Sequence, residues 1–168
     1  MFKILFVCTG NICRTPMAEY FLKDLIKREN LFYMVQVESA GIAALEGYPA
    51  AEFTAAVCEE FGIDTTFHRA RSLNLDMIDK ADLILCMALN HKLELIKNFP
   101  HSQNKIFLLK QFASKNVDTF HSIQDPYGGP KENYEKTFLE IRKEIYRIWP
   151  ELTRRIEEKW INANTKRQ

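Results

Sequence analysis

Residues 2–26 read FKILFVCTGNICRTPMAEYFLKDLI, an apolar run followed by a turn and then by helical spacing. The apolar run at 2–7 has β-branched and aromatic members, which predicts a strand buried on both faces of a parallel sheet. Residues 9–11 turn the chain, and apolar residues then return at helical spacing. This predicts a helix with Thr15 as its N-cap and Pro16 at its first position. The stretch therefore predicts a strand, a tight loop and a helix.

The same alternation continues along the chain. A second strand is expected from Val35 to Val37, ending at residues 39–41, and further strands at 82–87 and 105–109. Further helices are expected at 50–61, at 90–98 and from about Lys131. Pro150 either kinks the last helix or marks its boundary, and residues 151–168 are an amphipathic continuation that docks on the domain or meets a partner. Alternating strands and helices predict an α/β fold with four parallel strands and helices on both faces. Ligands bind such sheets beyond the C-terminal ends of the strands, so the loop after the first strand is the favoured place.

Composition limits the classes of function. The apolar fraction of 46% and charged fraction of 27%, without a polar linker, predict a single domain over residues 1–168. A net charge of +1 offers no broad basic face, so neither nucleic acid nor membrane is an expected partner. The four cysteines form no C-x-x-C pair and the four histidines are scattered, so no metal site is expected. The apolar start is too short for a signal peptide, which predicts a cytoplasmic protein with reduced thiols.

The loop at 8–15, CTGNICRT, places Cys8 six positions before Arg14. Lying between a buried strand and a helix start, it can turn successive backbone N–H groups toward one centre, which suits a phosphate dianion. The same field favours the thiolate form of Cys8, and Arg14 can grip two phosphoryl oxygens with its planar fork. Within the loop, Thr15 can donate to the sulfur and Asn11 can brace the turn. The candidate phosphate-binding residues are Thr9, Gly10, Asn11, Ile12, Cys13, Arg14 and Thr15.

At these residues the sequence resembles the low-molecular-weight protein tyrosine phosphatase family. The likeness consists of the C-x-G-N-x-C-R-[ST]-P motif at 8–16, the Ser-Ala-Gly element at 39–41 and the Asp-Pro-Tyr element at 125–127. The resemblance implies hydrolysis of a phosphorylated protein through a phosphocysteine intermediate on Cys8, without metal or cofactor. It also implies that Asp125 acts as general acid and then as base, and that Ser39 supports the loop by hydrogen bonding near Asn11.

Two kinds of substrate are compatible with this resemblance. Phosphoarginine phosphatases share the short loop at 125–129 but typically carry Thr where this chain has Ile12. An isoleucine has no hydroxyl to meet a guanidinium-linked phosphate and can pack against an aryl ring, which favours phosphotyrosine. Leu45, Tyr48 and Tyr127 are the other candidate pocket walls, each equally compatible with a packing or surface role. Tyrosine phosphatases often have a second aromatic residue where Gly128 stands, which leaves the substrate range open.

Two other functions are less favoured by the sequence. Thiol-dependent arsenate reductases share the loop but relay a disulfide through two further cysteines after the third strand, and no cysteine follows Cys86 here. A non-catalytic phosphate-binding module would not need the nucleophile, the arginine and the acid together. Cys13 is close enough in sequence to form a reversible disulfide with Cys8, while Cys58 and Cys86 are expected in the core.

Overall fold

The computed structural model describes residues 1–115 and 121–165. Four strands, β1 (Phe2–Cys8), β2 (Val35–Gly41), β3 (Leu83–Cys86) and β4 (Ile106–Leu108), form a parallel sheet in the order β2-β1-β3-β4. After β1 the chain first adds β2 on one side and then β3 on the other. The loop that follows β1 therefore lies at the point where strand order reverses, as the sequence predicts.

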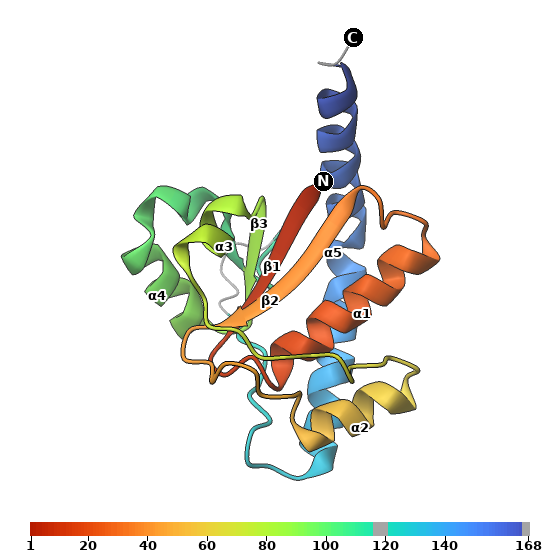
Figure 1. Cartoon of the computed structure of the whole chain (residues 1–168), viewed down its shortest axis with the longest axis vertical. Helices are drawn as coiled ribbons and strands as arrows, with labels where there is room; N and C mark the ends of the chain where they lie inside the picture. The colour runs from red at the N-terminus through yellow and green to blue at the C-terminus, as the bar shows by residue number, and fades with distance from the viewer. Residues whose placement is uncertain (116–120, 166–168) are drawn as a thin grey trace.

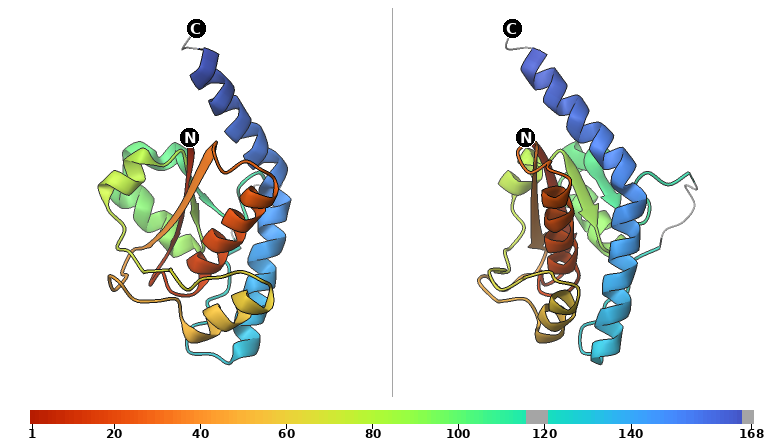
Figure 2. Two further views of the ribbon diagram at one scale, coloured as in Figure 1. Left: turned by 45° about the vertical axis from the view of Figure 1, so that its right-hand side comes forward. Right: turned by 90° about the vertical axis from the view of Figure 1, so that its right-hand side faces the viewer.

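Helices cover both faces of the sheet (Figures 1 and 2). The first face carries α1 (Arg14–Arg28), α2 (Glu52–Glu60) and α5 (Lys131–Thr165), and the second carries α3 (Leu75–Lys80) and α4 (Leu89–Asn98), followed by a 3-10 helix at Pro100–Lys105. Alternate residues of β1 point to opposite faces, so Phe6 packs in the first core and Leu5 in the second. This arrangement confirms the predicted α/β fold with helices on both faces.

The last helix is long because its apolar stripe continues past the proline. Pro150 is exposed and the helix runs on to Thr165, so Pro150 is not a boundary. The stripe lies buried on the domain along most of its length, through Tyr134, Phe138, Ile141, Ile145, Ile148, Leu152 and Ile156. The amphipathic continuation therefore docks on the domain as predicted, while residues 166–168 of that segment lie outside the described residues. In Figure 1 the C-terminal end of α5 projects beyond the sheet.

The start of α1 differs from the sequence prediction. The helix begins at Arg14 with Cys13 in the N-cap position, so the prediction that Thr15 caps it was wrong. The Thr15 hydroxyl is engaged instead with Cys8 and Asn11 inside the loop. Pro16 consequently stands at the third helical position, which costs little because the first four N–H groups of a helix have no intrahelical acceptor.

Two short elements had no counterpart in the sequence prediction. Helix α3 has six residues and is capped by Asn74, whose side chain accepts from the Met77 N–H at 3.0 Å. The 3-10 helix follows Phe99 directly. Both are too short for a periodic pattern to show. Of the long loop predicted at 114–130, residues 116–120 lie outside the described part of the chain. Within the described residues, no helix is long and apolar enough to cross a membrane.

Candidate active site

The loop at residues 8–15, here called the phosphate loop, is anchored from outside through its carbonyl groups. Thr9 O accepts from the Ala43 N–H at 3.0 Å, and Ile12 O accepts from the Ala51 N–H at 2.8 Å. Asn11 O accepts from His68 Nε2 at 2.7 Å. Asn11 itself has a φ of 55°, a left-handed conformation that asparagine tolerates better than most residues. With these carbonyls held outward, the loop can present its N–H groups to the interior of the turn.

The Asn11 side chain is the centre of a buried network behind the loop. Its Nδ2 group donates to Thr15 Oγ1 at 2.9 Å and to Ser39 Oγ at 2.8 Å, and its Oδ1 accepts from the Arg71 N–H at 2.9 Å. The Ser39 hydroxyl in turn donates to Glu19. The bond between Asn11 and Ser39 is the one that the family resemblance implies. Since Asn11 is fully buried, its three bonds fix the loop conformation.

Two donors point at the Cys8 sulfur. Thr15 Oγ1 lies 3.0 Å from Cys8 Sγ, and the Asn11 N–H donates to the same sulfur at 3.3 Å. Because Thr15 Oγ1 already accepts from Asn11 Nδ2, its own proton is free to donate to the sulfur. Cys8 is only 3% exposed and stands where β1 ends, so the thiol faces the centre of the loop. Both groups can therefore donate to the sulfur when it attacks or leaves phosphorus.

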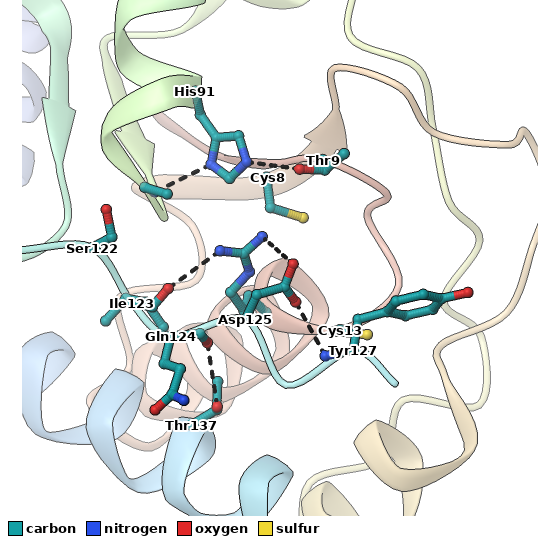
Figure 3. Close-up of polar contacts among 12 residues, drawn as sticks. Cys8, Thr9, Cys13, His91, Ser122, Ile123, Gln124, Asp125, Tyr127 and Thr137 are labelled. Carbon is teal, nitrogen blue, oxygen red and sulfur yellow. Dashed lines mark hydrogen bonds and ion pairs between the residues drawn. The ribbon is translucent and has the colours of Figure 1, made fainter. Parts of the chain in front are cut away.

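Arg14 and Asp125 meet across the site although they are far apart in the sequence. Arg14 Nη1 donates to Ile123 O at 3.2 Å, and Arg14 Nη2 lies 3.2 Å from Asp125 Oδ2 (Figure 3). The other carboxylate oxygen of Asp125 accepts from the Tyr127 N–H at 3.2 Å. Ile123 is held beside the end of β3 because its N–H donates to Met87 O at 2.7 Å. Asp125 thus reaches the phosphate loop on a segment that is bonded to the chain just beyond the C-terminal end of β3.

These groups open onto one cavity of about 330 Å³. Cys8, Arg14 and Asp125 line it together with the four wall residues expected from the sequence, Ile12, Leu45, Tyr48 and Tyr127, and with Thr9, Gly10, Asn11, Cys13 and Ala43. Thr15, at the end of the loop, and Ser39, behind the loop, do not line the cavity. Leu45, Tyr48 and Tyr127 are 64%, 56% and 72% exposed, which places them at the rim.

Sequence reasoning missed four residues that hold the site, namely Glu19, His68, Arg71 and His91. It considered the histidines only as metal ligands, whereas His68 and His91 are buried and bind the phosphate loop. Burial lowers the pKa of both imidazoles, that of His91 to about 4 with the neighbouring Arg14 charge contributing. His91 does carry a signal, because a polar side chain three residues after an N-cap often reaches back to the N-cap N–H. Nothing in the sequence pattern distinguishes the other three.

The remaining cysteines are poorly placed for exposed thiolate chemistry. Burial raises the pKa of Cys13 to about 11, and its thiol lies 3.8 Å from the Tyr134 hydroxyl. A protonated thiol attacks an oxidised cysteine slowly, so the disulfide between Cys8 and Cys13 stays a prediction. Cys58 and Cys86 are fully buried in α2 and β3, as expected. Within residues 1–115 and 121–165, no group of three His, Cys, Asp or Glu side chains lies close enough to hold a metal ion.

A cysteine and an arginine six residues apart, after the first strand of a doubly wound parallel sheet and opposite an aspartate, define a cysteine-dependent phosphatase. Comparison with known proteins makes the assignment specific. The model of the family described as low molecular weight phosphotyrosine protein phosphatase matches residues 3–159. This chain belongs to that family, and it is therefore an enzyme of a class that acts on phosphorylated proteins.

Individual relatives carry two kinds of name. A protein-arginine-phosphatase of Geobacillus stearothermophilus is 40% identical over 147 residues, which is 88% of this chain and 93% of the relative. The low molecular weight protein-tyrosine-phosphatase Ptp of Acinetobacter johnsonii is 38% identical over 140 residues, 83% of this chain and 90% of the relative. A solved structure of a YwlE arginine phosphatase mutant with a phosphorylated active-site serine has a TM-score of 0.85 at 31% identity. It covers 92% of this chain and 99% of that one.

Proposed function

We propose that this protein hydrolyses phosphotyrosine in proteins through a phosphocysteine intermediate on Cys8. The observation that carries the proposal is the convergence of the Cys8 thiol, the Arg14 guanidinium and the Asp125 carboxylate on one cavity. The three groups come from the end of β1, the start of α1 and the loop before α5. Each is held in place by hydrogen bonds: Cys8 by Thr15 and Asn11, and Arg14 and Asp125 by one another.

In the first step the Cys8 thiolate attacks phosphorus and the bond to the leaving oxygen breaks. Protonated Asp125 gives its proton to that oxygen, and Arg14 follows the charge on the phosphoryl oxygens into the transition state. In the second step Asp125 takes a proton from water, whose oxygen attacks phosphorus and releases Cys8 as the thiolate. Thr15 and Asn11 stabilise that leaving thiolate by the two hydrogen bonds to sulfur. No step calls for a metal or cofactor.

Ile12 favours an aryl substrate. Ile12 lines the cavity together with Cys8, and its aliphatic side chain can pack against a ring attached to the phosphate. Leu45, Tyr48 and Tyr127 line the same cavity and are exposed at its rim. We propose that these three side chains contact the ring or the flanking peptide of a phosphotyrosine substrate.

Phosphoarginine is the second candidate substrate, and a specific observation favours it. The relative with 40% identity is named a protein-arginine-phosphatase, and the loop of residues 125–129 has the short Asp-Pro-aromatic-Gly-Gly form. Arsenate reduction is less favoured because Cys86 is buried within β3 and its burial raises the pKa of the thiol. A binding role without turnover is less favoured because Asp125 would then have no chemical task.

We propose further that the chain acts as one domain over residues 1–168, in the cytoplasm, with no nucleic acid or membrane as partner. The net charge of +1 and the four cysteines, none of which is in a disulfide, support this setting.

The first experiment compares phosphate release from matched phosphotyrosine and phosphoarginine peptides, without added metal, for the protein and for Cys8→Ser. We expect release mainly from phosphotyrosine and its loss in Cys8→Ser. A phosphorylated cysteine trapped by acid quenching should map to Cys8. Absence of Cys8-dependent release from both peptides would overturn the enzymatic proposal.

A pair of variants tests the role of Ile12 in substrate choice. Val and Thr have the same shape and differ only in the hydroxyl, so Ile12→Val and Ile12→Thr separate volume from polarity. We expect Ile12→Val to keep the preference for phosphotyrosine, and Ile12→Thr to shift the ratio of kcat/KM values toward phosphoarginine by about tenfold, the size of one hydrogen bond made or lost. Equal ratios for the two variants would show that residue 12 does not choose the substrate.

A further inference from the structure

The N-terminal end of α4 lies between the phosphate loop and the segment that carries Asp125. Two of its free backbone N–H groups are satisfied by side chains rather than by the helix. The Ala88 N–H donates to His91 Nδ1 at 3.1 Å, and the Leu89 N–H donates to Ser122 Oγ at 3.0 Å. Ser122 stands three residues before Asp125, so this helix end is tied directly to the segment that leads to the acid.

The bond from Ala88 decides the protonation of the His91 ring. Since Nδ1 accepts a hydrogen bond, it carries no proton, and the neutral imidazole has its proton on Nε2. Nε2 lies 2.9 Å from Thr9 Oγ1, so the ring donates to the threonine hydroxyl (Figure 3). His91 is 1% exposed, and burial together with Arg14 favours the neutral ring while Asp125 opposes it.

The donated hydrogen bond orients Thr9 in turn. Because Thr9 Oγ1 accepts from His91, the proton of the hydroxyl points away from the ring. Thr9 lines the cavity with Cys8 and Arg14, so the hydroxyl proton is free to turn toward a group bound there. The Thr9 carbonyl is held by the Ala43 N–H at 3.0 Å, so the carbonyl and the hydroxyl of this residue both have a fixed partner.

We propose that His91 is a positioning residue that fixes Thr9 against the N-terminus of α4 and turns the Thr9 hydroxyl proton toward a bound oxyanion. The inference rests on the proposed function, since the oxyanion site is the site of the phosphoryl group. One side of the imidazole is tied to the helix that also binds Ser122, and the other side is tied to the phosphate loop. The ring therefore sets the spacing between the two halves of the active site.

Two conservative variants separate the two bonds of the ring. In His91→Asn the amide oxygen replaces Nδ1 and keeps the bond to Ala88, but the side chain no longer reaches Thr9. In His91→Gln the amide nitrogen replaces Nε2 and keeps the bond to Thr9, but Ala88 loses its acceptor. We expect His91→Asn to weaken binding of orthovanadate, measured by calorimetry, by about fivefold, with only a small fall in Tm because the Ala88 N–H keeps its acceptor. We expect His91→Gln to lower Tm and to retain vanadate affinity.

Thr9→Val completes a double-mutant cycle with His91→Asn. If the ring acts through the hydroxyl, Thr9→Val weakens vanadate binding as much as His91→Asn does, and the double variant is no weaker than either one. The control is His101→Asn, because His101 lies on the surface and pairs with Asp79 away from the cavity. That control should change neither affinity nor kcat.

The outcomes distinguish this inference from the proposed function. Additive losses in the double variant, or unchanged vanadate affinity in His91→Asn, would overturn the role of His91 and reduce it to a cap of α4. Cys8-dependent phosphate release would stand in that case. If the parent protein binds vanadate but releases no phosphate from either peptide, the proposed function would be overturned instead. The coupling between His91 and Thr9 could still be measured in that case.

Discussion

The two loops that meet at the cavity are built differently. The phosphate loop is mostly buried, with Asn11 and Thr15 fully buried and Arg14 only 5% exposed, although Thr9 is exposed at the cavity. The loop at residues 121–130, here called the acid loop, is mostly exposed, and the side chain of Asp125 is 53% exposed. The difference matches the two tasks. Charge stabilisation requires groups fixed before the reaction, whereas the acid must reach a leaving oxygen and later a water.

The anchors of the acid loop lie near its start, where Ser122 Oγ accepts from the Leu89 N–H. Ile123 is buried and bonded to Met87 O, and Gln124 O accepts from Thr137 Oγ1 at 3.4 Å. Beyond these, the Arg14 guanidinium is the partner that directs Asp125 inward. Changes in the acid loop should therefore alter activity with little effect on stability, while changes behind the phosphate loop should alter both.

The largest effect is expected for Asp125→Asn. Asparagine keeps the shape but cannot give up a proton, so kcat on a phosphotyrosine peptide should fall by about 10²- to 10⁴-fold. The free energy of unfolding should change by no more than about 0.5 kcal/mol, because the side chain is exposed. Asp79→Asn, an exposed aspartate that pairs with His101, is the control and should retain full activity. A normal kcat in Asp125→Asn would remove Asp125 from the mechanism.

A matched pair of asparagines tests the rigidity of the phosphate loop. Asn11 and Asn30 have φ angles of 55° and 57°, a region that glycine adopts freely, so Asn→Gly causes no backbone strain at either position. Asn11→Gly removes three buried hydrogen bonds and leaves their partners unpaired, which should cost about 4 kcal/mol of unfolding free energy in urea titrations. Asn30→Gly should change stability by about 0.5 kcal/mol or less. Equal effects would show that the network behind the loop contributes no rigidity.

The contrast between local motifs and tertiary contacts also explains which parts of the structure could be predicted from the sequence. The sheet, its helices and the loop after β1 could be predicted from hydrophobic periodicity and from turn residues, because buried strands and amphipathic helices have regular patterns of apolar residues. The motif at 8–16 also located Cys8 and Arg14, and the family resemblance located Asp125 and Ser39. Each of these residues lies within a local pattern or a short motif.

The support behind the phosphate loop could not be predicted in this way. Glu19, His68 and Arg71 come from α1 and from the segment before α3, and their bonds to Asn11 and Ser39 depend on tertiary packing. A histidine that will be buried looks the same in sequence as an exposed one. The N-cap of α1 was misplaced for a related reason, since Thr15 was assigned by local capping preference whereas its hydroxyl serves Cys8.

His91, which bonds to the phosphate loop and to the helix end that also binds the acid loop, predicts a dependence of stability on pH. Burial lowers the pKa of His91 from an ordinary 6.5 to about 4, so the unfolded chain binds a proton in this range and the folded protein does not. The contribution of His91 to the free energy of unfolding is fully present above pH 6.5 and decreases as the pH falls from 6.5 to 4. Below pH 4 it does not change further. The total loss is about 3 kcal/mol. His91→Asn should flatten the corresponding part of the curve measured by urea unfolding, and an unchanged slope would contradict the assignment.

The smallest effect is expected at the rim. Tyr127 belongs to the acid loop and is 72% exposed, so Tyr127→Ala should leave Tm unchanged. An aromatic contact with the substrate ring contributes about 1 kcal/mol, so KM for a phosphotyrosine peptide should rise about fivefold while kcat changes little. Tyr127→Phe keeps the ring and should behave like the parent protein. A fall in kcat for Tyr127→Ala would instead mean that the residue holds Asp125 in place, and the rim could not then be separated from the acid loop.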